Sequence, residues 1–222
     1  MQKTKIEWTD YVWNPIKGIC PVRCKLPDGR IYCYGRKIYK RFKRPPKLSW
    51  DGRIPILSNK KPSRIFVCST IEIFHPQIPK EWRDTIFTII EADYNKKHTF
   101  QILTKFPHLV DRPMPDNVWL GVSITGNSND DFMRASYFGF LPRKAKIQFI
   151  SYEPLLEMPS YNIPHVDWII IGKLTRHGHK YDPKREWIEK IISSEEAKSK
   201  PIFLKDNLKE IWGEPLIQEM PK

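Results

Sequence analysis

The sequence predicts an α/β protein built as a (β/α) barrel, incomplete, with six to seven parallel strands. Short β-type runs alternate with helical patterns along the chain. Several runs are wholly apolar, as in Trp168–Ile171, which is typical of parallel strands buried on both faces. The chain has 222 residues, whereas a full eight-stranded barrel typically needs ~250. We therefore expect a single barrel domain over residues 1–222.

The individual elements follow from these patterns. Runs rich in β-branched and aromatic residues predict strands at Tyr11–Pro15, Arg64–Cys68, Thr99–Thr104, Val118–Ser123, Lys146–Ser151, Val166–Gly172 and Pro201–Lys205. Apolar residues at helical spacing predict helices at Tyr34–Lys43, Lys80–Tyr94, Asn127–Phe138 and Pro183–Glu196, with a shorter helical turn at Phe106–Val110. A looser segment at about 44–63 reads as a loop inserted between the first helix and the second strand.

Three of the four cysteines, Cys20, Cys24 and Cys33, lie within fourteen positions and look like a set of metal ligands. A tetrahedral zinc site usually takes two close pairs of donors, and no second pair follows here. Three thiolates suit a [4Fe-4S] cluster better, because one iron is then left open for a cofactor or substrate. Zinc, or thiols without metal, are the alternatives. If Cys68 completed a set of four thiolates, no iron would stay open.

Six residues, Lys25–Arg30, separate the second cysteine from the segment that carries the third. Their centre, Pro27–Gly29, is a strong turn signal. We therefore expect the insertion to fold back on itself and to return Cys33 close to Cys24.

Composition excludes several classes of protein. Hydrophobic residues make up 40% of the chain, enough for a sizeable core, so a wholly disordered chain is excluded. No signal peptide is recognisable ahead of Trp8, and no apolar run approaches the length needed to span a bilayer. We expect a cytoplasmic protein that has no membrane partner, and in a reducing cytosol clustered cysteines more often bind metal or catalyse than form disulfides.

In a (β/α) barrel the active site lies at the carboxyl ends of the strands. Polar residues follow each predicted strand there: Ser69, Thr70, Glu72 and His75; Thr104 and Lys105; Ser123 and Thr125; Ser151 and Glu153; Lys173; and Lys205, Asp206 and Asn207. Glu72, Lys105 and Glu153 have apolar neighbours, where an unpaired charge is costly, so they are candidates for catalysis or for an ion pair with one another. A third possibility is a (β/α) enzyme in which a zinc ion activates a water molecule, and His75 is then the candidate zinc ligand near the cysteines. His177 and His179 lie in a loop with Arg176 and Lys180, which favours solvent exposure over a metal pair.

A series of segments matches a known family in order: Ile6–Asp10, Trp13–Pro15, the cysteine loop to Tyr34, Gln101–Lys105, Val118–Ser123, Ser151–Leu156, Asp167–Gly172 and Phe203–Asp206. Over nearly its whole length the chain resembles the phage and prokaryotic family labelled after phage gene products thirty-seven and sixty-eight, which is regarded as radical S-adenosylmethionine-like. The six-residue insertion departs from the family pattern. So does Gly172–Thr175, where relatives read Gly-Gly-Glu-Ser, and Glu72 stands where an aspartate is usual.

The resemblance implies a fold and cofactors more firmly than a substrate. It implies that Cys20, Cys24 and Cys33 hold a [4Fe-4S] cluster, that S-adenosylmethionine binds the open iron, and that a low-potential electron donor triggers cleavage to a 5′-deoxyadenosyl radical. Catalytic roles are then expected for Glu72, Lys105 and Glu153, and contacts to the cofactors for Tyr32, Tyr34, Ser69, Ser123, Ser151 and Lys173. A partner protein is a further expectation.

The formal net charge of +13 favours a polyanionic partner. Basic residues cluster at Arg36, Lys37, Lys40, Arg41, Lys43, Arg44 and Lys47, directly after the cysteine loop. On a helix, Tyr34, Ile38 and Phe42 would share an inward face and leave the basic residues exposed. A nucleic acid is therefore expected as substrate or partner, and a basic surface that serves solubility is the plain alternative. A different class of function also fits: a nucleic-acid-binding protein with a purely structural iron–sulfur or zinc site and no radical chemistry.

Overall fold

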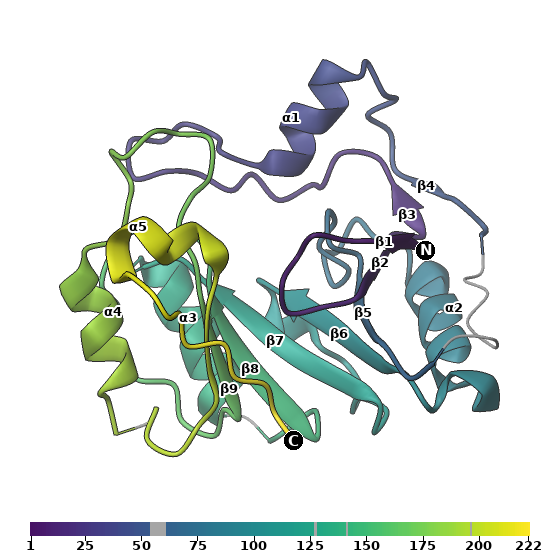
Figure 1. The fold of residues 1–222 in the computed structure, drawn as a ribbon. Helices are drawn as coiled ribbons and strands as arrows, with labels where there is room; N and C mark the ends of the chain where they lie inside the picture. The colour runs from purple at the N-terminus through teal and green to yellow at the C-terminus, as the bar shows by residue number, and fades with distance from the viewer. Residues whose placement is uncertain (54–60, 127, 141, 196) are drawn as a thin grey trace.

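The structure, a computed structural model, describes residues 1–53, 61–126, 128–140, 142–195 and 197–222. At its centre is an eight-stranded sheet (Figure 1). Its strands, in spatial order, are β1 (Gln2–Lys3), β2 (Tyr11–Trp13), β5 (Arg64–Val67), β6 (Thr99–Thr104), β7 (Val118–Ile124), β8 (Ile147–Tyr152), β9 (Trp168–Ile171) and β10 (Ile202–Leu204). Strand β1 is antiparallel to β2, and every later neighbour is parallel. The protein is therefore α/β with a mostly parallel sheet, as predicted.

The seven parallel strands lie side by side in the order in which they occur in the chain. Each coincides with a predicted strand to within about two residues at either end. Pairing of β1 with β10 would close the sheet, and the described residues show no such pairing. The sequential order is what repeated right-handed βα units produce, since each new strand is laid beside the one before it.

All four predicted helices and the predicted turn after β6 are present, whereas the short last helix and two of the 3-10 turns were not predicted. The helices are α1 (Tyr34–Arg41), α2 (Lys80–Glu91), α3 (Asn129–Phe140), α4 (Arg185–Ile192) and α5 (Lys209–Trp212), with 3-10 turns η1 (Asp93–Asn95), η2 (Pro107–Leu109) and η3 (Asp206–Leu208). The predicted start of the third helix at Asn127 and the predicted end of the fourth at Glu196 lie outside the described residues. The second helix is shorter than predicted because the chain turns extended at Ala92, with ψ at 139°. No helix in the described parts of the chain has the length and apolarity needed to cross a membrane.

A second, two-stranded sheet joins β3 (Ile16–Lys17) to β4 (Ser49–Trp50) and was not predicted. Its two strands lie just before and after the segment that holds the cysteine loop and α1. The pairing places Ser49 and Trp50, from the expected inserted loop at 44–63, beside Ile16 and Lys17. Residues 54–60 of that loop lie outside the described residues. Gly18 has φ at +114°, and a Cβ there would lie 2.6 Å from the carbonyl oxygen of Lys47, so only glycine lets the two chain segments pass this closely.

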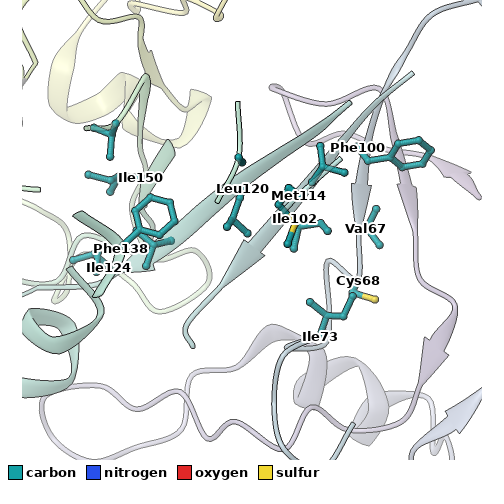
Figure 2. Close-up of a cluster of buried hydrophobic side chains, with 14 of the residues drawn as sticks. Val67, Cys68, Ile73, Phe100, Ile102, Met114, Leu120, Ile124, Phe138 and Ile150 are labelled. Atoms are coloured by element: carbon teal, nitrogen blue, oxygen red, sulfur yellow. The ribbon is translucent and has the colours of Figure 1, made fainter. Parts of the chain in front are cut away.

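One face of the sheet packs against helices and carries the larger hydrophobic core. Alternate strand residues such as Val67, Ile102, Leu120 and Ile150 point into it (Figure 2). Helices α2 and α3 add Ile86, Phe87, Ile90, Ala135 and Phe138. Each such large side chain contributes about 1.5–3 kcal/mol when fully buried, so this layer fixes the sheet on which the polar strand ends stand.

The opposite face of the sheet holds an aromatic core of Trp8, Phe66, Phe149, Trp168 and Phe203, with Ile170 among them. The segment before β2 covers it with Trp8, whose ring lies 4.9 Å from that of Phe66. Gly121 leaves room for Phe149, because a Cβ at Gly121 would lie 2.4 Å from that ring. Toward the carboxyl ends of the strands, the positions in the same alternation are polar: Lys105, Ser123, Ser151, Glu153 and Lys205.

Candidate functional site

The cysteine loop folds back on itself as a short hairpin. Lys25 pairs with Ile31 in an antiparallel bridge, and the N–H of Leu26 donates to the carbonyl of Arg30 over 2.8 Å. The N–H of Tyr32 then donates to the carbonyl of Cys24 over 3.1 Å. The turn uses Gly29 at φ +83°, a conformation that favours glycine. The predicted fold-back of the insertion is confirmed, and it brings the third cysteine back to the second.

The three thiols share one neighbourhood at the carboxyl end of β5. The backbone N–H of Glu72 donates to the Sγ of Cys20 over 3.4 Å. Burial raises the pKa of Cys20 to about 11 and also raises the pKa of Cys24, and a charge on Cys33 would raise the latter further. In the described part of the chain, no three Cys, His, Asp or Glu side chains form a group that could hold a metal ion as they stand.

Cys68 belongs to the hydrophobic core and not to the loop. Its side chain is buried beside Ile73, at the end of β5 (Figure 2). Burial raises the pKa of its thiol, and the charges of Glu72 and Cys20 act in the same direction. Its thiol is therefore within electrostatic range of Cys20 while packed among apolar side chains.

Glu72 lies buried between the cysteine loop and β6. Its Oε1 accepts from the Oγ1 of Thr104 over 2.7 Å and from the N–H of Phe74 over 3.2 Å, and its Oε2 accepts from the N–H of Lys105 over 2.6 Å. Burial raises the pKa of Glu72 although these donors oppose the shift. The carboxylate therefore ties the loop after β5 to the end of β6.

Lys105 and two serines line the polar end of the aromatic face. The Nζ of Lys105 donates to the Oγ of Ser123 over 2.7 Å. Removal from solvent lowers the pKa of Lys105, although the nearby Cys24 and Glu72 oppose that shift. Ser123 and Ser151 are paired across β7 and β8, and the buried Oγ of Ser151 has no hydrogen-bond partner among the described residues. One cation and one free hydroxyl thus lie on neighbouring strands.

Glu153 and Lys173 have partners of their own. Glu153 forms an ion pair with Lys205, which also lies 3.8 Å from Glu7. The Nζ of Lys173 lies 3.0 Å from Asp182 and 3.1 Å from Glu210. The three candidate catalytic residues therefore make no ion pair with one another: Glu72 binds the backbone N–H of Lys105, and Glu153 pairs elsewhere.

Two smaller candidates hold the loops in place. The amide of Asn14 and the Oγ of Ser69 exchange hydrogen bonds of 3.1 and 3.2 Å, which joins the ends of β2 and β5. Tyr32 lies behind Cys24, and burial raises the pKa of its phenol. Tyr32 belongs to the cysteine loop itself, and Ser69 directly follows Cys68 at the end of β5.

Helix α1 buries none of its residues, so the predicted inward face of Tyr34, Ile38 and Phe42 is wrong. Tyr34 and Phe42 are 55% and 58% exposed. The helix stands away from the sheet (Figure 1) and is anchored through another side: the N–H of Gly18 donates to the hydroxyl of Tyr39 over 2.7 Å, and Arg36 donates to the carbonyl of Cys20 over 2.8 Å. Helical spacing shows which residues share a face, but it does not show which face meets the protein.

The basic residues of the predicted nucleic-acid surface divide into two groups. Arg36 is part-buried and bonded to the cysteine loop, and Lys37 lies 2.6 Å from His177. The remaining members are exposed: Lys40, Arg41, Lys43 and Arg44. The guanidinium groups of Arg41 and Arg44 lie over the ring of Phe42. An exposed basic surface with an aromatic ring at its centre therefore follows the cysteine loop.

The loop between β9 and α4 reaches over to the cysteine hairpin (Figure 1). The hydroxyl of Tyr181 donates to Asp28 and accepts from Arg30 over 2.9 Å. The guanidinium of Arg176 lies 5.6 Å from the centre of the Tyr34 ring. His179 is exposed and bonded to Asp182, as expected from its setting, and His177 is bonded to Lys37. The hairpin is thus held from both ends of its turn.

A pocket of about 890 Å³ opens beside the hairpin. It is lined by residues 21–27 and Tyr32 of the cysteine loop, by Lys105 and the turn after β6, and by the start of α3. There the buried Asp131 accepts from the N–H and hydroxyl of Thr125, from the Oγ of Ser128 and from Arg134.

Sequence reasoning missed Asp131 and Arg134. A Ser-x-x-Asp pattern at Ser128 marks the start of the helix and was the available signal, since the N–H of Asp131 donates back to the Oγ of Ser128 over 3.1 Å. That pattern reports a helix cap, however, and not that the helix start would meet the cysteine loop.

The chain was compared with curated proteins, solved structures and models of protein families. No curated protein and no solved structure matches the chain. Residues 3–218 match the model of a family described as a protein of unknown function, DUF5131. This match covers nearly all of the chain, and the protein therefore belongs to the DUF5131 family.

Proposed function

We propose that this protein is a radical S-adenosylmethionine enzyme whose Cys20, Cys24 and Cys33 hold a [4Fe-4S] cluster. The observation that carries the proposal is the hairpin of the cysteine loop, in which Tyr32 bonds to Cys24 and so returns Cys33 to it. The seven parallel strands in sequential order support an incomplete (β/α) barrel of the radical-SAM type, with the loop at the carboxyl ends of the strands, where such folds place their active sites.

The donor set fits the proposed cluster. Three thiols come from one loop, and Cys68 is held apart in the core. The raised pKa of Cys20 and of Cys24 means that both are protonated at neutral pH without metal, and a bound metal would replace those protons. The N–H of Glu72 already points at the Sγ of Cys20, as backbone donors to cluster thiolates do. Because the thiols form no ready metal group, loading has to draw the loop together.

The chemistry that such a cluster supplies when bound is one-electron cleavage of S-adenosylmethionine to a 5′-deoxyadenosyl radical, with the electron coming from a low-potential donor. The protein's own residues bind and orient. Lys105 and Ser123, together with the free hydroxyl of Ser151, offer a cation and donors for the carboxylate of the cofactor. Glu72 fixes the backbone that carries Lys105. Glu153, paired with Lys205, and Lys173, paired with Asp182, shape the far side of the site.

The exposed basic surface of α1 supports a nucleic acid as substrate or partner. Lys40 and Arg41 lie in the last turn of the helix, Lys43 and Arg44 follow directly after it, and the first turn has no acidic residue. Phosphate contacts from such a surface give affinity that does not depend on sequence. The rings of Tyr34 and Phe42, which the fold leaves exposed, lie beside arginine side chains and add aromatic surface for contact with bases.

The proposal is tested by anaerobic reconstitution with iron and sulfide. We expect about four irons per chain for the wild type, and an electron paramagnetic resonance spectrum that changes when S-adenosylmethionine is added. The Cys20→Ala, Cys24→Ala and Cys33→Ala variants should each lose most of the iron, while Cys68→Ala should keep it. Bound zinc in place of iron, or equal loss of iron in Cys68→Ala, would instead support a closed, structural site.

A further inference from the structure

The pocket beside the cysteine hairpin has one wall made of rings. His75 meets Phe106 edge to face with centroids 5.4 Å apart, Phe106 lies 5.7 Å from His108, and His108 lies 5.3 Å from Tyr137. All four residues line the pocket. They come from three separate loops and helices, so the row is built by the fold and not by one sequence segment. Tyr137 is 38% exposed, which leaves part of its ring free to stack.

The charged lining is dominated by cations without partners. Arg23 and Lys25 line the pocket, and the described residues give the side chain of neither one a hydrogen bond or an ion pair. The Nζ of Lys105 donates to the neutral Ser123, and the described residues give this amine no ion pair. Among the acids, Asp131 is saturated by four donors, Asp130 lies 3.9 Å from Arg134, and Glu157 is left without a partner among the described residues. A negatively charged group entering the pocket therefore meets more free cations than free acids.

The same pocket offers groups that recognise the edge of a base. The N–H of Gln77 donates to the Nδ1 of His75 over 3.1 Å, so the neutral ring carries its proton on Nε2 and can donate from there. Glu157 also lines the pocket and has no partner among the described residues, which makes its carboxylate a free acceptor for an amino group. Rings for stacking, cations for phosphate and a donor with an acceptor for a base edge are thus gathered in one pocket.

We infer that this pocket binds one nucleotide unit, with its base against the ring wall and its phosphate on Arg23 and Lys25. A pocket of about 890 Å³ lies in the usual range for ligand sites, roughly 300–1,000 Å³. The inference rests on the proposed function, since Cys24 and Tyr32 line the same pocket and a base held there lies beside the proposed cluster. S-adenosylmethionine has no phosphate, and its one carboxylate is assigned above to Lys105, so it would leave Arg23 and Lys25 without an anionic partner.

The nucleotide has two sources, a free nucleotide or one nucleotide of a single strand. The exposed basic surface of α1 follows the cysteine loop directly and would contact the phosphates of a strand that continues out of the pocket. Binding should be measured by fluorescence anisotropy of a labelled single-stranded heptanucleotide, with nucleoside monophosphates as competitors. If a nucleoside monophosphate displaces the labelled strand at concentrations equal to those of the unlabelled strand, the ligand is a free nucleotide. If the strand binds at least tenfold more tightly than the monophosphate, the ligand is one nucleotide of a single strand.

Two variants and two matched controls test the pocket. Tyr137→Leu and Lys25→Gln should each weaken binding about fivefold to tenfold, as expected for the loss of one stacking ring or one phosphate contact. Tyr94→Leu and Lys190→Gln remove an exposed ring and an exposed cation elsewhere and should leave binding within about twofold. A strand with one abasic position should bind more weakly than the intact strand.

Three results would overturn the inference. The first is no binding of either the strand or the mononucleotide, and the second is equal binding by Tyr137→Leu, Lys25→Gln and the wild type. The third is an abasic strand that binds as tightly as the intact strand, with inorganic polyphosphate displacing both strands. The last would assign binding to the basic surface alone. These binding measurements need no cluster, so failure of this inference can be distinguished from failure of the proposed function. Failure of the proposed function alone would appear as absent iron and absent cleavage of S-adenosylmethionine while nucleotide binding persists.

Discussion

Tyr32 donates its backbone N–H to the carbonyl oxygen of Cys24 over 3.1 Å, and this bond closes the hairpin that unites the cysteine loop. The hairpin turn depends on Gly29, whose φ is +83°. It is also held from outside by Tyr181. The placement of Cys33 next to Cys24 is thus a property of the turn and of the loop after β9, and both can be changed without touching a cysteine.

The first prediction concerns the turn. A Cβ at Gly29 meets nothing within 4 Å, so Gly29→Ala acts only through its φ and should destabilise the hairpin by about 1 kcal/mol. We expect a lower iron content after reconstitution and faster proteolysis of the loop. Gly213→Ala is the matched control, because Gly213 has φ at +92° with open space around it but lies near the C-terminus. Equal iron content in the two variants would contradict the role of the turn.

The second prediction concerns the loop after β9. Tyr181→Phe removes the hydroxyl that bonds Asp28 and Arg30 while keeping the ring. The amides of residues 25–31 should then exchange with deuterium faster, because the hairpin loses its outer support. Tyr94→Phe removes an exposed hydroxyl elsewhere and should leave the same amides unchanged. If both variants exchange like the wild type, the loop does not hold the hairpin.

The third prediction follows from the thiol of Cys20. Burial raises its pKa to about 11, so its thiolate is scarce at neutral pH in the metal-free protein. Alkylation of Cys20 by iodoacetamide at pH 7 should be roughly 100-fold slower than that of free cysteine, and the rate should still be rising with pH above 9. Peptide mass spectrometry after timed alkylation gives the rate. A plateau near pH 8.5 would show an unburied thiol.

The fourth prediction concerns Glu72. Glu72→Gln puts an amide N–H₂ where one carboxylate oxygen accepts from a buried donor, either Lys105 N–H or Thr104 hydroxyl. Leaving such a donor unpaired should lower the free energy of unfolding at pH 7 by about 1–3 kcal/mol, measured by urea denaturation.

The stability difference between the wild type and Glu72→Gln should depend on pH with a definite sign. The folded-state pKa of Glu72 is raised above its unfolded value, so its contribution to stability is fully present below the unfolded pKa and is lost as the pH rises through the folded pKa. The wild type should therefore lose stability relative to Glu72→Gln as the pH rises from about 4. Parallel pH profiles for the two proteins would contradict a raised pKa.

The fifth prediction concerns the aromatic face of the sheet. A Cβ at Gly121 would lie 2.4 Å from the ring of Phe149, which is fully buried and cannot retreat. Gly121→Ala should lower the free energy of unfolding by roughly 1–3 kcal/mol through overpacking. The double variant Gly121→Ala, Phe149→Leu should recover part of that loss, because the smaller side chain makes room. Thermal denaturation of the three proteins measures both effects.

The strands were predictable because burial on both faces leaves a strong local signal. Trp168–Ile171 is buried throughout, and Thr99–Thr104 forms a strand with the predicted bounds. The turn of the cysteine hairpin was also predictable, because the residues Pro27–Gly29 favour a turn through their own local conformations. The two-residue strands β1, β3 and β4 were missed because so short a segment carries no periodicity.

The rest depends on contacts between distant segments. Tyr34 and Phe42 share a helical face, yet that face is exposed because Tyr39 and Arg36 anchor the helix. The ring wall of the pocket joins His75 to Tyr137, sixty-two positions apart in the sequence. No local pattern in either segment reports that they meet.

The most direct test of the central claim is release of 5′-deoxyadenosine from S-adenosylmethionine. The reconstituted protein is reduced with dithionite under anaerobic conditions, and the product is measured by liquid chromatography. We expect release by the wild type and by Cys68→Ala, and none by Cys24→Ala. A protein that holds four irons per chain and changes its spectrum on reduction, but releases no 5′-deoxyadenosine, would contradict radical chemistry and leave a structural cluster.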